Sequence, residues 1–211
     1  MTGTTTVLLV AIALGAGANW WSRAVDSDTV EAWSKPLVTI LVAVLAATAD
    51  APVSQRVVAV VALLLCLGGD VALMPAVDKF VVGLASFLLG HLVFVGQFVL
   101  QGLDEPALGA AAVVLALVLV TTVGRRIVAG ATASDPALRL PVAAYLLVIS
   151  TMTIVGWSTG RPWLIIGSTA FVLSDSVLGW RQFVSTSDRR WMSVTVMVTY
   201  HLAITGLALG V

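Results

Sequence analysis

Residues 55–74 read QRVVAVVALLLCLGGDVALM, an apolar run that carries a single acidic residue, Asp70. About 20 predominantly apolar residues form an α-helix long enough to cross the hydrocarbon core of a bilayer. A carboxylate at that depth is costly, so by default it faces a protein-lined interior and serves function. A second apolar run, residues 162–183, contains Asp175, while the other nine of the eleven acidic residues fall in short polar connections. These two aspartates are therefore the first candidates for chemistry.

The composition excludes an ordinary soluble domain. Of the 211 residues, 59% are hydrophobic and 10% are charged, with a mean hydropathy of +1.05, whereas a soluble domain carries about 25% charged residues. Eleven basic and eleven acidic side chains balance, so no nucleic-acid partner is expected. The single cysteine, Cys66, lies in an apolar run, which excludes a disulfide framework or a cysteine metal site. We predict an integral membrane protein.

The apolar runs predict an all-α bundle of about eight transmembrane helices. Their expected ranges are 4–21, 36–49, 55–74, 80–100, 106–123, 139–157, 162–183 and 191–210. The first run lacks the positively charged region that begins a signal peptide, so we interpret it as a retained helix. The connections are too short for a separate domain, which makes residues 1–211 one membrane domain. A weak 4+4 repeat, with units at 1–101 and 106–211, is also indicated.

Positive charge predicts the orientation in the membrane, since Lys and Arg concentrate in cytoplasmic loops. Nine of the eleven basic residues lie in or beside the odd-numbered connections. They are Arg23, Lys35, Lys79, Arg125, Arg126, Arg139, Arg181, Arg189 and Arg190. We therefore expect a multi-pass protein of the cell membrane with both termini outside and the odd-numbered connections in the cytoplasm.

Several polar residues lie inside the predicted spans at related depths. At a rise of about 1.5 Å per residue, Asp70, Asp175, His91 and His201 all fall in the cytoplasmic half of the membrane, and Tyr200 adjoins His201. Because these side chains come from different helices, we predict one shared cavity that opens toward the cytoplasmic half. They are the candidate catalytic residues.

Two helix faces add candidate substrate contacts. On the seventh span, Ser168, Asp175 and Gln182 fall near one meridian of an ideal helix, and a polar stripe on a membrane helix points inward. On the fourth span, an aromatic stripe on the face of His91 could pack against neighbours or line a slot for an acyl chain. With Lys35, which precedes Pro36 at the expected start of the second span, the candidates are Lys35, Phe87, Phe94, Ser168, Ser174 and Gln182.

Each of these residues also has a structural interpretation. A buried aspartate can cap a broken helix, and a buried histidine can bridge helices. Two histidines and an aspartate would suffice for catalytic zinc, but no local spacing resembles a metal motif, so neither metal nor cofactor is predicted. The Gly-x-Gly-Asp signature of intramembrane aspartyl proteases is absent, because position 67 is Leu.

Five motifs occur in order along the chain: KP at 35–36, GDVALM at 69–74, GLASFLLGH at 83–91, GSTAFVLSDS at 167–176 and TYHLA at 199–203. With this order and eight expected spans, the chain resembles the YhhN-type lysoplasmalogenase family of small integral membrane proteins. It departs from the family at Tyr200-His201 and Ile204, where the family tends to carry an aromatic pair and a glutamine. Phe94 stands where the family often has tyrosine.

The resemblance implies cleavage of the vinyl-ether bond of lysoplasmalogens, which gives a fatty aldehyde and a glycerophospho-base. The substrate would then be a lysophospholipid drawn from the membrane. Such a bond hydrolyses by protonation of its β-carbon, and water captures the resulting oxocarbenium ion. One protonated carboxylic acid and one ionised carboxylate are needed, as in glycosidases, which pass through a similar cation.

We expect Asp70 and Asp175 to be this pair, with the roles of acid and base unassigned. His91, Tyr200 and His201 would position the water or polarise a carboxylate. The substrate phosphate would be held near the cytoplasmic surface by Lys35, with Lys79 or Arg181.

The main alternative is a small proton-coupled transporter that uses the same carboxylates as a relay. Such carriers show Gly or Pro interruptions at mid-membrane in matching halves, and Gly68-Gly69 has no clear counterpart. A structural membrane protein would leave two buried carboxylates without a purpose. The sequence carries no signal of oligomeric state.

Overall fold

The computed structural model describes residues 3–187 and 190–211, so Arg189 lies outside the described residues. Within these ranges the chain forms helices and no strand. They are α1 (Gly3–Ala24), α2 (Asp28–Ala47), α3 (Val53–Ala72), α4 (Phe80–Gln101), α5 (Pro106–Leu119), the π-helix η1 (Val120–Gly124), α6 (Arg125–Ser134), the short 3-10 helix η2 (Pro136–Leu138), α7 (Arg139–Ser158), α8 (Pro162–Phe183) and α9 (Arg190–Leu209). Eight helical segments of the described chain are long and apolar enough to cross a membrane. The predicted all-α, eight-span fold is confirmed.

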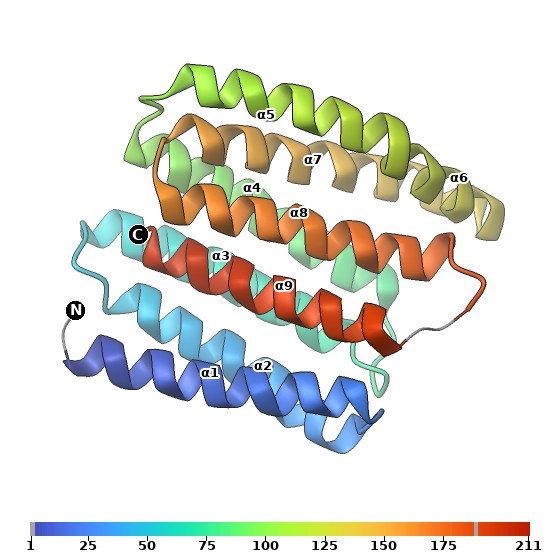
Figure 1. Cartoon of the computed structure of the whole chain (residues 1–211), viewed down its shortest axis with the longest axis horizontal. Helices are drawn as coiled ribbons and strands as arrows, with labels where there is room; N and C mark the ends of the chain where they lie inside the picture. The colour runs from blue at the N-terminus through green and yellow to red at the C-terminus, as the bar shows by residue number, and fades with distance from the viewer. Residues whose placement is uncertain (1–2, 188–189) are drawn as a thin grey trace.

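Seven of the helices form a closed ring. Going around it, α1, α2, α3, α4, α7, α8 and α9 each contact the next, and α9 packs back onto α1 (Figure 1). α9 also contacts α2 and α3 across the ring. In an 18-residue apolar stretch of α9, 61% of the residues are buried, against 17% in the corresponding stretch of the segment Pro106–Ser134. α9 is thus the most buried of the eight spans, whereas α5 lies outside the ring against α7.

The two ends of the bundle differ. Both termini lie at one end, and the connections that follow α1, α3, α6 and α8 lie at the other (Figure 1). We call this second end the basic end, because the odd-numbered connections carry the excess of Lys and Arg. The assignment of the basic end to the cytoplasm stays a prediction from the charge distribution.

The second span begins at Asp28 rather than at residue 36, so its predicted start is wrong. Asp28 and Glu31 occupy its first turn, where negative charge interacts favourably with the helix N-terminus. Lys35 and Pro36 lie inside the helix. Proline there costs a backbone hydrogen bond, and the helix continues through it. Lys35 is consequently held within the bundle instead of at a helix start.

The fifth span is longer than predicted. Residues 106–123 were expected to end before a connection, but helical structure continues through η1 and α6 to Ser134. Arg125 and Arg126 do not end it, because both side chains are exposed and the Arg126 guanidinium lies 5.7 Å from the ring centre of Trp180 on α8. Long basic side chains reach water from a helix end in this way.

Glycines set the closest contact between α8 and α9. A Cβ built on Gly206 would lie 3.2 Å from both the Gly167 Cα and the Trp163 carbonyl oxygen, which are backbone atoms that cannot rotate away. Gly206→Ala is expected to lower stability by about 1–3 kcal/mol through overpacking. The control is Gly96→Ala, where a Cβ would meet no other side chain or helix of the described residues within 4 Å and alanine should be neutral or stabilising by up to about 1 kcal/mol. Thermal denaturation in detergent tests both, and equal stability of the variants would contradict the packing argument.

Candidate active site

Asp70 lies on α3, close to its C-terminal end at the basic end of the bundle, and its side chain is fully buried. The preceding glycines allow α4 to approach: a Cβ on Gly69 would lie 2.5 Å from the ring of Phe87, and one on Gly68 would lie 2.8 Å from the Ser86 hydroxyl. The mid-span Gly-Gly pair is thus explained by close helix packing. It directs Asp70 into the interior of the ring.

Three side chains from two other helices surround the Asp70 carboxylate. Thr39 of α2 donates a hydrogen bond of 2.6 Å to Oδ2, and the Tyr200 hydroxyl of α9 donates one of 2.7 Å to the same oxygen. The Lys35 Nζ lies 3.5 Å from Oδ1. Lys35 is itself buried, with 8% of its surface exposed. A buried charge requires a partner of this kind, so Lys35 and Asp70 balance each other.

Asp175 lies on α8 and is half-buried. Tyr145 of α7 donates a hydrogen bond to its Oδ2. Unlike Asp70, Asp175 forms no ion pair with a Lys or Arg of the described chain. The two aspartates therefore sit in different surroundings: one carboxylate is next to a cation and two hydroxyl donors, and the other is next to one phenol.

Both aspartates line one cavity of about 120 Å³ at the basic end, here called the aspartate cavity. With about 30 Å³ for each water of the liquid, it has room for water and a small polar fragment. Its other polar lining residues come from α1, α2, α8 and α9 and are Arg23, Glu31, Lys35, Ser174, Arg181, Ser193 and Tyr200. Its apolar wall includes Leu73, Phe87, Leu178, Val196 and Met197. The cavity thus combines charged groups toward the helix ends with hydrocarbon behind them.

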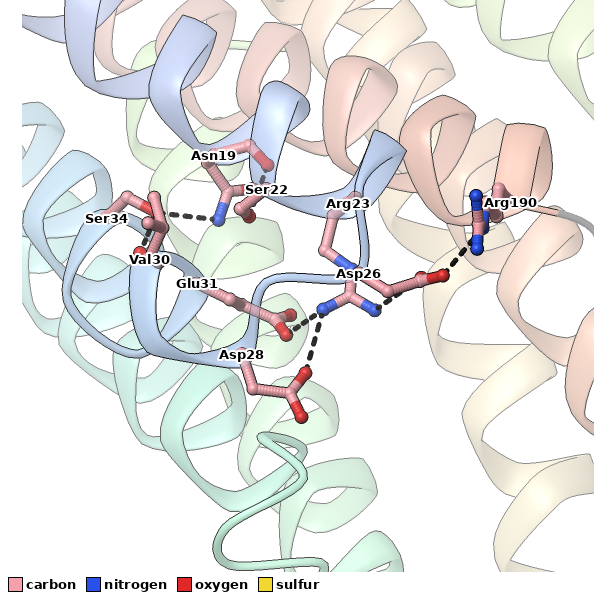
Figure 2. A network of polar contacts seen from close by, with 9 residues as sticks. All are labelled: Asn19, Ser22, Arg23, Asp26, Asp28, Val30, Glu31, Ser34 and Arg190. Carbon is pink, nitrogen blue, oxygen red and sulfur yellow. Dashed lines mark hydrogen bonds and ion pairs between the residues drawn. The ribbon is translucent and has the colours of Figure 1, made fainter.

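A polar network joins the α1–α2 connection to α9 beside the mouth of this cavity (Figure 2). Arg23 forms an ion pair with Glu31 and lies 3.5 Å from the Asp28 carboxylate and 4.0 Å from that of Asp26. Asp26 in turn accepts from Arg190 Nε at 2.6 Å. Because Arg23 and Glu31 both line the cavity, this network sets the charge at its mouth.

The structure separates the predicted site residues into two groups. Asp70, Asp175 and Tyr200 line the aspartate cavity together with the predicted substrate contacts Lys35, Phe87 and Ser174. Gln182 is exposed and lines an adjoining apolar slot with Asp175. Phe94 and Ser168 lie elsewhere: Phe94 stacks on Phe98 in the core, and the Ser168 hydroxyl bonds to the Ile165 carbonyl within α8.

The two histidines are not among the residues that line the cavity. The His201 Nδ1 accepts a hydrogen bond of 3.0 Å from the indole of Trp20 on α1. His91 is buried, its ring 4.5 Å from that of Phe171 and 5.3 Å from that of Tyr145, and neither of its nitrogens has a hydrogen-bond partner among the described residues. Tyr145 thus contacts both the His91 ring and the Asp175 carboxylate. The catalytic role of both histidines stays a prediction.

Two contact residues of the aspartates were not predicted. Thr39 lies one turn after Lys35 on the same helix face, and a search for polar residues at that spacing would have found it. Tyr145 is one of only two tyrosines in the chain, so its position in an apolar span was a usable signal. Across residues 3–187 and 190–211, no three His, Cys, Asp or Glu side chains come together as a metal-binding group.

Comparison with known proteins gives the family context. The YhhN family matches residues 30–211. A Mycobacterium bovis protein named lysoplasmalogenase is 32% identical over 128 residues, which cover 58% of this chain and 49% of that protein. Human lysoplasmalogenase TMEM86B is 32% identical over 138 residues, which cover 64% of this chain and 54% of the human protein. The rat protein of that name is 31% identical over 128 residues, or 60% and 49% of the two chains. The chain thus spans about half the length of the curated relatives it matches, and no solved structure matches it.

Proposed function

The chain belongs to the YhhN family, and from this premise we propose that it is an intramembrane hydrolase that cleaves the vinyl-ether bond of lysoplasmalogen-type lysophospholipids. The names of the mycobacterial and mammalian relatives support the substrate class. The observation that supports the chemistry is the aspartate cavity, in which two carboxylates from different helices have unequal surroundings. The products are a fatty aldehyde and a glycerophospho-base.

The unequal surroundings suggest which aspartate plays which role. A nearby cation and hydrogen-bond donors favour the ionised form of a carboxylate, so Asp70, beside Lys35, Thr39 and Tyr200, is the general base. Asp175 has no such cation in the described chain and is the general acid. Its hydrogen bond from Tyr145 occupies Oδ2 and leaves the other oxygen to carry the proton.

In the proposed first step, Asp175 gives its proton to the β-carbon of the vinyl ether. The electrons of the C=C bond form the new C–H bond, and the ether oxygen stabilises the cation at the neighbouring carbon. Water then adds to that carbon while Asp70 takes one of its protons. Asp70 Oδ1 faces the Lys35 ammonium at 3.5 Å and accepts no hydrogen bond from another side chain of the described residues, so it is the oxygen that would accept from this water.

In the proposed second step, the hemiacetal breaks down. Its hydroxyl proton passes to Asp175, the bond between carbon and the glycerol oxygen breaks, and Asp70 returns its proton to that oxygen. Both carboxyl groups recover their starting forms, so no other reactant than water is consumed. General acid–base catalysis of this kind contributes typically about 10²–10⁴-fold to rate.

The cavity mouth would hold the head of the substrate. Arg23, Lys35 and Arg181 line it, and guanidinium groups match phosphate geometry well. Arg23 is paired with Glu31 in the structure, so a phosphate would compete with that carboxylate. On the positive-inside assignment, this mouth faces the cytoplasm.

The proposal predicts where a solvent proton goes. Purified protein in D₂O, given a 1-alkenyl lysophosphoethanolamine, should release aldehyde with one deuterium on the carbon next to the carbonyl, because the β-carbon takes its hydrogen from a carboxyl group in exchange with solvent. Immediate reduction to the alcohol prevents later exchange, and mass spectrometry reads the label. Parallel samples contain EDTA and the lysophosphocholine analogue.

The outcomes separate the alternatives. Deuterated product that persists with EDTA supports the dicarboxylate mechanism. Activity that EDTA removes would assign the chemistry to a bound metal instead. A folded protein that releases no aldehyde from either lipid would overturn the proposed hydrolase, and proton flux in proteoliposomes would then test the transporter alternative.

A further inference from the structure

Three cavities lie in series from Asp175 to the outer face of the bundle. The aspartate cavity shares Leu73, Phe87, Asp175 and Leu178 with an apolar slot of about 50 Å³ between α4, α6, α7 and α8. The slot shares Leu146 with a groove of about 920 Å³ between the segment Pro106–Ser134 and α7, here called the α5/α7 groove. The linings of the three cavities are therefore continuous from the carboxyl groups, past Leu146, to the outside of the ring.

The slot is closed in this structure. A water needs roughly 10–15 Å³ of space accessible to its centre, so the slot has room for only a few water molecules, which is too little for a long hydrocarbon chain. Apart from Asp175 and Tyr145 at its inner end, its wall is mainly aliphatic and aromatic, with Phe80, Ile149 and Val172 among the lining residues. Side chains must move before an alkyl chain can occupy it, and an apolar wall favours such an occupant over water.

The basic end of the slot is held by backbone contacts. A Cβ on Gly130 of α6 would lie 2.1 Å from the Phe183 carbonyl oxygen of α8, and one on Gly179 would lie 3.0 Å from the Ile127 side chain. Phe80 and Phe183 also meet edge to face, with ring centres 5.5 Å apart. Opening here requires helices to separate. Opening at Leu146 requires only the rotation of a half-buried side chain.

The π-helix lies opposite Leu146. A Cβ on Gly124, the last residue of η1, would lie 3.3 Å from Leu146 Cδ1. The Thr121 and Thr122 hydroxyls donate 2.6 Å hydrogen bonds to the Leu117 and Val118 carbonyls, in the last turn before η1. π-turns inside α-helices often mark functional sites. Here the irregular turn and its glycine face the side chain that separates slot from groove.

We propose that the α5/α7 groove and the slot form a lateral portal through which the hydrocarbon chain of the substrate passes from the bilayer to Asp175, with Leu146 as its gate. This inference rests on the proposed function and adds the route and the chain-binding surface. The occupant is a single aliphatic chain. Its head would lie at the mouth of the aspartate cavity, at the basic end of the bundle.

The shape and charge of the groove fit that occupant. Val113, Leu117 and Leu147 in its wall are exposed large apolar side chains. Its two charged lining residues, Arg125 and Arg139, belong to the basic end, where the phosphate of a lipid would lie. Residues 139–154 of α7 extend about 22 Å at 1.5 Å per residue, which exceeds half of the roughly 30 Å hydrocarbon core. A chain in the groove can therefore lie along one leaflet.

The gate is tested by Leu146→Trp, which should fill the junction of slot and groove. For a long-chain 1-alkenyl lysophospholipid we expect kcat/KM to fall about tenfold or more, and for a short-chain analogue that does not reach Leu146 it should stay within about twofold of wild type. The matched control is Leu140→Trp on the same helix, where the side chain is 79% exposed and lines neither slot nor groove. This variant should leave kcat/KM for both substrates unchanged.

A binding measurement keeps the portal separate from catalysis. The probe is a 1-alkyl lysophospholipid with a diazirine at the end of its chain. It has a saturated ether in place of the vinyl ether and so is not a substrate. The probe is photocrosslinked to wild type and to Leu146→Trp. Wild type should be labelled on the groove segments of α5 and α7, excess unlabelled long-chain lysolipid should compete, and Leu146→Trp should lose the competed label.

Each possible result either supports or overturns the proposed portal. Equal losses of activity on long and short chains in Leu146→Trp, or no loss on either, would overturn the gate. Groove labelling that lysolipid does not compete would assign the groove to bulk lipid only and overturn the portal. Competed labelling of a wild-type protein that releases no aldehyde would support the portal while the proposed hydrolase fails.

Discussion

Replacing Asp175 by Asn should reduce aldehyde release from a 1-alkenyl lysophospholipid by about 10²–10⁴-fold, the usual contribution of a general acid. Asparagine keeps the shape of the side chain, and its carbonyl oxygen can still accept the hydrogen bond from Tyr145. It cannot give a proton to carbon. Since Asp175 is half-buried and unpaired with any cation of the described chain, the fold should tolerate the change, and the loss should appear in kcat.

Two further variants serve as controls for Asp175→Asn. Tyr145→Phe removes only the hydrogen bond to Asp175, so it should lower the rate by far less than Asp175→Asn. Asp50→Asn changes an exposed aspartate that does not line the cavity and should leave the rate unchanged. An Asp175→Asn protein that is folded and retains more than about a tenth of wild-type activity would remove Asp175 from the role of general acid.

The spans could be predicted because each is a continuous apolar run, and the bilayer dictates its length. The predicted boundaries of two spans are wrong, because a charged residue or a proline is interpreted as the end of a helix. Lys35 and Pro36 lie inside α2 because Lys35 has a carboxylate partner, Asp70, on the neighbouring helix α3. Arg125 and Arg126 lie inside the fifth span because exposed arginines reach water from a helix end. The local sequence shows neither the ion pair of Lys35 nor the exposure of the two arginines.

The sequence predicts only those site residues whose burial in a membrane helix costs free energy. Asp70 and Asp175 stand out because a carboxylate in a membrane helix is expensive. Thr39 and Tyr145 do not, since they lie 31 and 30 residues along the chain from the aspartates that they contact. The same limit applies to the histidines: depth placed His91 and His201 beside the aspartates, but helix rotation turns them toward Phe171 and Trp20. Rotation about the helix axis is fixed by packing, which a single sequence does not show.

Lys35→Met should destabilise the protein by about 3–5 kcal/mol, because it leaves the Asp70 charge buried without its partner. For a chain of this length that corresponds to a fall of roughly 6–20 °C in Tm. Adding Asp70→Asn removes the unpaired charge. The double variant should therefore recover most of the lost Tm while remaining inactive, since the proposed general base is gone.

This cycle separates the structural role of the pair from its chemical one. If the Lys35–Asp70 pair served folding only, the double variant would regain both Tm and activity. If the pair were solvated enough to matter little, as exposed ion pairs are, Lys35→Met would leave Tm near that of wild type. The expected pattern, in which Tm recovers and aldehyde release does not, would show that the Asp70 carboxylate is needed for the reaction and that Lys35 stabilises the fold by balancing its charge. Thr39→Val provides the intermediate case, because it removes one 2.6 Å hydrogen bond to Asp70 but leaves the charge pair in place.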